Sequence, residues 1–462
     1  MHDHARHPNK LREFRRRQQP RPWTQERLAV EVARVAASLR IPITTNRKSL
    51  VVELSRWENG RHQVGPEYRR IFRTIYGVTD EQLGFLDTSP SETMPASWKN
   101  VSLRQPWAES LVQAQAEWGA DLERREFLKG AAYIAAASTT PALEWVLTEP
   151  DEISRNGAGE RIGAAHIAGI REMTATFRKL DNQFGGGQPR ASLVRYLSHE
   201  VAPLLIDGRY DHRTGQQLLS VSAEALKTLG WMSYDAGMQG AGQRYMTRTL
   251  HLARAADDIP LGAEILAGLS HQASYLGDGP TAVLLAQAAG QSARRGGLDV
   301  LVAEAAVMEA HGHACAGDEA ACAKALDKAE RALDKADRGA APEWIGYFDE
   351  AYLSAKFGHC FKVLRQPEQA ERFALRSLDM DNSYVRGRAF NLALLATAHA
   401  QAGDVEQACS VGAEAVNLTA QLESARARQY IRGLRHELRS AATAPAVVAF
   451  DELVASALPE AV

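Results

Sequence analysis

Gly277-Asp278-Gly279-Pro280-Thr281-Ala282 recurs in altered form as Gly317-Asp318-Glu319-Ala320-Ala321-Cys322 and as Gly403-Asp404-Val405-Glu406-Gln407-Ala408. Each copy carries a small residue five positions after its first glycine, and two weaker copies begin at Gly237 and Arg365. The starting positions are 40, 40, 48 and 38 residues apart, so each interval has room for two helices around a tight turn. The repeat predicts a solenoid of helix pairs, in which the small residue lets the second helix approach closely.

The hydrophobic periodicity is helical from Trp107 onward, with interruptions at 150–159 and 185–187, and no segment there has the pattern of a strand. We therefore expect an all-α chain with a small amino-terminal domain and a carboxy-terminal α-solenoid. The helix pairs resemble tetratricopeptide repeats of longer period, and HEAT-like pairs are the alternative. The expected layout is a first domain at 1–86, a linker at 87–106, a helical connecting region at 107–187, the repeats at 188–440, and a tail or capping helix at 441–462.

Charge divides the chain into two unlike parts. Residues 1–73 hold 17 Lys and Arg against 7 Asp and Glu, a net charge of +10. The remainder holds 37 against 49, a net charge of −12. A basic first domain on an acidic body favours a head that binds a polyanion and a body that the same polyanion repels.

Short amphipathic helices are expected in the basic part. Thr24 is a good N-cap, and Leu50, Leu54 and Trp57 share one helical face and predict a buried stripe. The Asn59-Gly60 pair stops that helix. The expected helices cover 10–17, 24–39, 47–58, 67–76 and 80–86.

Thr24-Gln25-Glu26 opens the second of these helices, and Ser55-Arg56-Trp57-Glu58-Asn59-Gly60 closes the third. With these residues, segment 11–84 resembles the Cro/C1-type, or xenobiotic-response-element, helix-turn-helix family, and the whole chain is similar to actinobacterial regulators. The resemblance implies double-stranded DNA as a partner, with Thr24, Gln25 and Arg56 at phosphates. Base contacts would come from the exposed early face of the third helix, which enters the major groove: Arg47, Lys48, Ser49, Val52 and Glu53.

One departure from the family concerns spacing. Residues 29–45 intervene before the third helix, where the family has only a few residues. Either the second helix is longer or a loop bulges outward.

Signatures of catalysis and of cofactor binding are missing from the sequence. It has no HExxH, no GxxxxGK[ST] and no GxGxxG that opens a helix. His311 and Cys315 are two ligands at most, and the four cysteines lack paired spacing. We therefore expect no enzyme activity, no cofactor and no metal.

The export and membrane alternatives are also disfavoured. Residues 124–129 resemble a twin-arginine signal but lie far inside the chain, where an amphipathic connecting helix is expected. No apolar run is long enough to span a bilayer. We expect a cytoplasmic protein that does not enter the membrane.

Two function classes remain. One is a sequence-specific DNA-binding transcriptional regulator with a sensory and dimerisation body; the other is a protein–protein interaction scaffold or peptide-binding module without DNA binding. The basic head favours the regulator. A homodimer on two half-sites is expected, because one small head offers limited specificity.

The concave face of the repeats is the expected site for a peptide, small-molecule or protein effector. Polar and aromatic side chains interrupt the alanine- and leucine-rich first helices of the pairs, where packing alone would not require them. These candidate effector residues are His271, Gln272, Tyr275, Glu309, His313, Tyr347, Glu350, Tyr352, Asn391 and His399.

Overall fold

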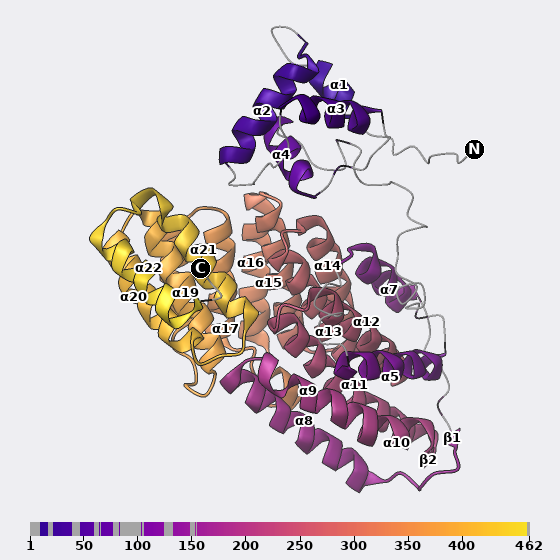
Figure 1. Cartoon of the computed structure of the whole chain (residues 1–462). Helices are drawn as coiled ribbons and strands as arrows, with labels where there is room; N and C mark the ends of the chain where they lie inside the picture. Colours follow the sequence, from indigo (N-terminus) through magenta and orange to yellow (C-terminus); the bar gives the residue numbers. More distant parts are fainter. Residues whose placement is uncertain are drawn as a thin grey trace, which may run out of the picture. The chain divides into compact units, whose positions relative to one another are not determined.

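The computed structural model divides the chain into two compact units, an amino-terminal unit, Met1–Ala96, and a carboxy-terminal unit, Ser97–Val462 (Figure 1). The residues that it describes are 10–16, 22–38, 47–59, 64, 66–76, 83, 103, 106–123, 133–147, 153 and 155–459. Regular structure in these ranges is almost entirely helical, as expected. Of the described helices, none is both long and apolar enough to cross a bilayer.

The helices of the amino-terminal unit lie close to their expected ranges: α1 (Leu11–Arg16), α2 (Gln25–Ser38), α3 (Arg47–Glu58) and α4 (Pro66–Tyr76). Thr24 caps α2, because its Oγ1 accepts a hydrogen bond of 3.2 Å from the backbone N–H of Arg27. The helix after Thr24 reaches Ser38, so a long second helix accounts for part of the unusual spacing. Residues 39–46, Gly60, the twin-arginine-like string 124–129, and most of the expected helix at 80–86 and linker at 87–106 lie outside the described residues.

A buried aromatic cluster forms the core of this unit. Trp57 is only 6 % exposed, and its ring centroid lies 4.6 Å from that of Tyr68 and 6.0 Å from that of Phe72. Leu50 and Leu54 are buried on the same face of α3. The buried stripe predicted for this helix is confirmed.

Glu58, next to Trp57, joins three helices. Its carboxylate accepts hydrogen bonds of 2.6 and 2.9 Å from Arg15 of α1, and one of 2.9 Å from the Gln25 amide of α2. The Glu58 side chain is fully buried, and a buried carboxylate needs such partners. The last residue of α3 is therefore a structural element of this unit.

The carboxy-terminal unit stacks helices successively along the chain (Figure 1). Its helical pairs are α11 (His212–Asp235) with α12 (Gln239–Ala255), α13 (Ile259–Tyr275) with α14 (Gly279–Gly296), α15 (Asp299–Cys315) with α16 (Glu319–Lys335), α17 (Glu350–Val363) with α18 (Pro367–Arg376), and α19 (Val385–Ala402) with α20 (Val405–Thr419). The flanking helices are α5 (Trp107–Glu123), α7 (Ala136–Leu147), α8 (Ala164–Phe184), α9 (Gly187–Tyr196), α10 (Ala202–Ile206), α21 (Ala425–Glu437) and α22 (Pro445–Ala457). Short helical turns occupy Leu197–Val201, Glu343–Ile345 and Leu438–Ala441.

Each repeat copy marks the turn inside one helix pair. The first positions, Gly237, Gly277, Gly317, Arg365 and Gly403, all have positive φ, between 59° and 88°. This conformation favours glycine, and Arg365 is the exception. The small residues five positions later are all buried, as close approach of the second helix requires: Gly242, Ala282, Cys322, Ala370 and Ala408.

One short ribbon corrects the expectation that the body contains no strand. β1 (Arg155–Asn156) pairs antiparallel with β2 (Arg209–Tyr210). Nearby, Gly159 N–H donates to the Asp207 carbonyl at 2.7 Å. Strands of two residues are too short to leave an alternating pattern in the sequence.

The two ends of the solenoid meet. Glu423 N–H donates to the Phe184 carbonyl, and Gly187 N–H donates to the Glu423 carbonyl, both at 2.9 Å. A Cβ atom at Gly187 would lie 2.8 Å from that same carbonyl oxygen, so only glycine fits this approach. In addition, α8 packs against α19 and α11 against α21. The inner face is thereby bounded by helices from both ends of the unit.

Candidate functional site

The exposed face of α3 is the first candidate site. Lys48, Ser49 and Arg56 are exposed, and Val52 is 50 % exposed although valine is apolar. Arg56 Nη1 lies 2.6 Å from Glu53 Oε1, one helical turn away. Arg47 begins the helix, and its side chain lies outside what the structure describes. The face of α3 opposite the core thus presents two cations, Lys48 and Arg56, together with the hydroxyl group of Ser49 and the methyl groups of Val52.

The two other candidate DNA contacts lie at the start of α2. Thr24 is exposed and its hydroxyl caps the helix. Gln25 is half-buried and its amide nitrogen donates to Glu58. The bond to Glu58 holds the Gln25 amide in one orientation.

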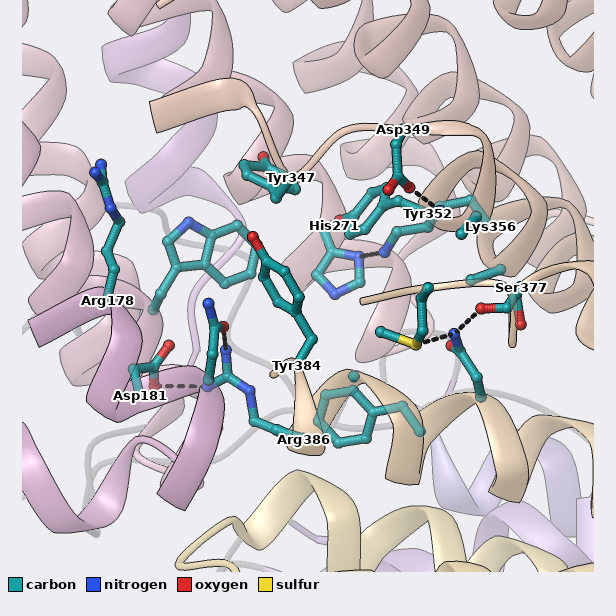
Figure 2. A pocket seen from close by; sticks show the side chains of 18 of the residues that line it. Arg178, Asp181, His271, Tyr347, Asp349, Tyr352, Lys356, Ser377, Tyr384 and Arg386 are labelled. Atoms are coloured by element: carbon teal, nitrogen blue, oxygen red, sulfur yellow. Dashed lines mark hydrogen bonds and ion pairs between the residues drawn. The ribbon is translucent and has the colours of Figure 1, made fainter. Parts of the chain in front are cut away.

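The second candidate site is a cavity of about 440 Å³ inside the carboxy-terminal unit, here called the central cavity (Figure 2). Its walls come from α8, α11, α13, α17, α19 and α21, and from the segments before α17 and α19. Pockets that bury a small organic ligand have volumes of about 300–1,000 Å³. Because the ends of the solenoid meet, the concave face expected to bind an effector holds a pocket of small-molecule size.

A network of paired charges forms the wall of the pocket beside α8. Arg386 Nη1 lies 2.6 Å from Asp181 Oδ1 and 3.5 Å from Asp235 Oδ2, and Figure 2 shows the first of these pairs. Asp235 also accepts hydrogen bonds of 2.9 Å from Gly186 N–H and from the Ser424 hydroxyl. Burial raises the pKa of Asp181, and the Arg386 charge opposes that rise. These charges join the two ends of the unit.

A second compensated cluster lies near Tyr347. Lys227 Nζ lies 3.1 Å from Glu264 Oε2, with both side chains buried. The Tyr347 hydroxyl donates at 2.6 Å to Glu304 Oε1. Burial, with the neighbouring Glu264 charge, raises the pKa of Glu304 to about 8. Glu264 therefore has a direct ion-pair partner in Lys227, while burial favours the protonated form of Glu304.

Lys356 differs from the other cations of the cavity. Its Nζ lies 2.7 Å from His271 Nδ1, and among the described side chains no carboxylate forms an ion pair with it. Burial, then the nearby Arg426 charge, lowers the pKa of Lys356 to about 7. Burial also holds the pKa of His271 well below its usual value, so this imidazole is neutral.

Arg426 lies on the other side of His271, with Nη2 3.4 Å from His271 Nε2. Its guanidinium stacks over the rings of Tyr234, at 4.3 Å, and Phe390, at 4.7 Å. Arg426 Nη1 also forms a long ion pair with Asp235 Oδ1, at 3.9 Å. Its buried Nε has no hydrogen-bond partner among the residues that the structure describes.

The ten candidate effector residues separate into two groups. His271, Tyr347, Tyr352 and Asn391 line the central cavity; Tyr275 does not line it, but its ring centroid lies 5.7 Å from the guanidinium of Arg426, which does. The others lie elsewhere. Gln272 donates to Gln239, Glu309 pairs with Lys328, Glu350 pairs with Arg338, His399 lies 3.9 Å from Glu371, and His313 is half-buried near the end of α15.

The charged residues of the cavity were missed in the sequence. Several cations line the cavity, whereas the ten effector candidates chosen from the sequence contained no lysine or arginine. They include Lys227, Lys356, Arg386 and Arg426. A signal existed for Lys356, which is flanked by Ala355 and Phe357 in the middle of an apolar helix. A lysine in such surroundings is expensive to bury and so indicates a function.

Neither metal-ligand clusters nor comparisons with known proteins identify a further site. Within the described ranges, His, Cys, Asp and Glu side chains nowhere gather in threes or more that could hold a metal ion. Neither models of known families nor curated proteins match this chain.

Proposed function

We propose that the chain is a sequence-specific DNA-binding transcriptional regulator, whose amino-terminal unit acts as a helix-turn-helix and whose tetratricopeptide-like body senses an effector. The observation that carries this proposal is the exposed face of α3. Lys48 and Arg56 are exposed there beside Val52, while the opposite face is buried. Cations can neutralise phosphates, and a valine methyl group can contact the methyl group of thymine.

The charge distribution supports the same proposal. The +10 of residues 1–73 would attract DNA, and the −12 of the remainder would keep the body away from it. Glu58 does not belong to the DNA-facing set, because its carboxylate is buried on Arg15 and Gln25. The base-reading candidates remain Arg47, Lys48, Ser49, Val52 and Glu53.

The test is selection of bound duplexes from a random DNA pool with the full chain, followed by binding titrations over a salt series. Arg56→Ala should weaken binding to all sequences alike and reduce the slope of log K against log salt by about 1, because one phosphate contact is lost. Arg34→Ala is the matched control, since Arg34 pairs with Glu31 on α2 as Arg56 pairs with Glu53 on α3. It should bind like the wild type.

Recovery of no preferred sequence, with salt-independent binding, would contradict the proposal and favour the scaffold alternative. A homodimer that binds two half-sites is part of the proposal, because symmetry doubles the number of base contacts. Sedimentation at micromolar concentration with the selected duplex should give two chains per duplex. One chain per duplex would contradict dimeric binding.

The central cavity is the proposed effector site. It joins helices from the beginning, middle and end of the carboxy-terminal unit, so a bound ligand can favour one arrangement of these helices over another. Its volume of about 440 Å³ favours a small molecule over an extended peptide.

A further inference from the structure

The hydrogen bonds of His271 determine the protonation state of Lys356. A guanidinium only donates hydrogen bonds, so Arg426 Nη2, at 3.4 Å, donates to His271 Nε2. A neutral imidazole then carries its proton on Nδ1 and donates it to Lys356 Nζ, 2.7 Å away. Only a neutral amine can accept that bond. The three side chains are therefore mutually satisfied when Lys356 is uncharged.

A buried lysine without an ion-pair partner is costly, and none of the described carboxylates forms an ion pair with Lys356. Lys227 has Glu264, and Arg386 has Asp181. Lys356 is 5 % exposed and lies over the Tyr352 ring, 5.1 Å from the centroid. Arg426 lies on the far side of the same imidazole, and its buried Nε has no hydrogen-bond acceptor among the described residues. At this wall of the cavity Lys356 thus has no carboxylate ion pair among the described residues, and Arg426 has only the Asp235 carboxylate, 3.9 Å away.

The remaining wall is largely aromatic. Figure 2 shows the Lys356 side chain meeting His271, with Tyr347, Tyr352 and Tyr384 around the same space. Trp231, Phe390 and Tyr430 also line the cavity. Aromatic faces favour a flat apolar body, and a charge-assisted hydrogen bond favours an anionic group.

We propose that the central cavity binds a small aromatic organic anion, with its acidic group on Lys356 and its ring system among the aromatic side chains. The inference rests on the proposed function, because it names the effector class for the same cavity. On binding, Lys356 takes up one proton from solvent and becomes an ammonium, which gives up the hydrogen bond from His271 Nδ1–H and donates to the anion. Arg426 adds a second positive charge on the far side of His271.

The test is isothermal titration calorimetry of the full chain with three probes of one shape. The probes are 1-naphthylacetate, 1-naphthyl phosphate and the neutral 1-naphthylacetamide. At least one anion should bind roughly tenfold or more tightly than the amide, as a charge-assisted hydrogen bond in a buried site predicts. The stronger of the two anions distinguishes a carboxylate ligand from a phosphate ester.

Lys356→Met should abolish this preference, so that the affinities for the preferred anion and for the neutral amide lie within about threefold of each other. Lys362→Met is the control, because Lys362 lies on the same helix but does not line the cavity. It should keep the preference. Circular dichroism checks that both variants fold.

Three results would overturn the inference: the amide binds as well as both anions, no probe binds at millimolar concentration, or Lys356→Met keeps the preference. DNA binding is measured separately, in the salt series. Loss of anion binding with DNA binding intact would contradict only the proposed class of ligand. Normal anion binding without sequence-specific DNA binding would remove the proposed function.

Discussion

Replacing Lys356 by methionine is expected to stabilise the carboxy-terminal unit. Burial lowers the pKa of this amine from 10.5 to about 7. Each pKa unit corresponds to about 1.4 kcal/mol of folding free energy, so the buried amine costs about 4–5 kcal/mol near neutral pH. Methionine has a similar length and no charge, so this cost disappears in the variant, but the His271 Nδ1–H that donated to the amine loses its acceptor, which offsets about 1–3 kcal/mol of the gain.

The gain should depend on pH in a definite direction. The folded chain releases the Lys356 proton near pH 7, whereas the unfolded chain holds it to about pH 10.4. The unfolded state therefore binds more protons in this interval, and the wild type gains stability as pH rises through it. The advantage of Lys356→Met should be largest below pH 7 and smaller by about 3–4 kcal/mol at pH 10. The other charged or titratable groups facing the amine are common to both proteins: His271 of α13, Glu304 and His311 of α15, Arg426 of α21, and Tyr352, His359 and Cys360 of α17.

Thermal unfolding followed by circular dichroism measures the effect. Near pH 7 the variant should melt about 3 °C higher, from the net gain and the typical unfolding entropy per residue of a unit this long. Lys227→Met is the matched control of opposite sign. It leaves the buried Glu264 without its 3.1 Å partner and should cost roughly 3–5 kcal/mol.

The reasoning fails if Lys356→Met melts at or below the wild type near pH 7. It also fails if the advantage is the same at pH 7 and pH 10. Either result would mean that the amine is charged and compensated in the folded protein.

Three further predictions concern folding. Trp57→Ala should destabilise the amino-terminal unit by roughly 3–5 kcal/mol, because a buried aromatic side chain is lost; an unchanged melting temperature of this unit would show that Trp57 is not essential to its core. Glu58→Ala should destabilise the same unit by about 2–4 kcal/mol, since Arg15 and Gln25 lose their buried acceptor, and urea unfolding would measure it. Gly277→Ala should cost about 1–2 kcal/mol for backbone strain alone, because φ is +80° and nothing lies within 4 Å of the added Cβ. An unchanged unfolding midpoint for Gly277→Ala would mean that the turn relaxes.

Local structure was largely predictable because it depends on neighbours in sequence. The helix at 47–58 agrees with α3 at both ends, since a buried stripe and a stop at Asn59 specify it locally. The turns at Gly237, Gly277, Gly317, Arg365 and Gly403 follow from the repeat spacing. The ribbon of β1 with β2 escaped prediction, because two residues carry no readable period.

The candidate site was predictable only in part. Polarity within apolar helices was enough to select His271, Tyr352 and Asn391, which line the cavity. Tyr347 also lines it, but it lies in the turn before α17 and not on a helix as expected. The same rule selected Glu309, which has its own partner, Lys328, on the neighbouring helix. Polarity shows that a side chain needs a partner, but it does not show whether the protein supplies one.

The sequence by itself determined the helical repeat, the positions of its turns, and the division into a basic first domain and an acidic body. These depend on local backbone preference, on periodic burial and on composition. Only the tertiary structure decided that the solenoid ends meet through Glu423, and that His271, Lys356 and Arg426 share one wall. These three residues come from α13, α17 and α21, and the pKa of Lys356 is lowered because the folded chain excludes water from their common space.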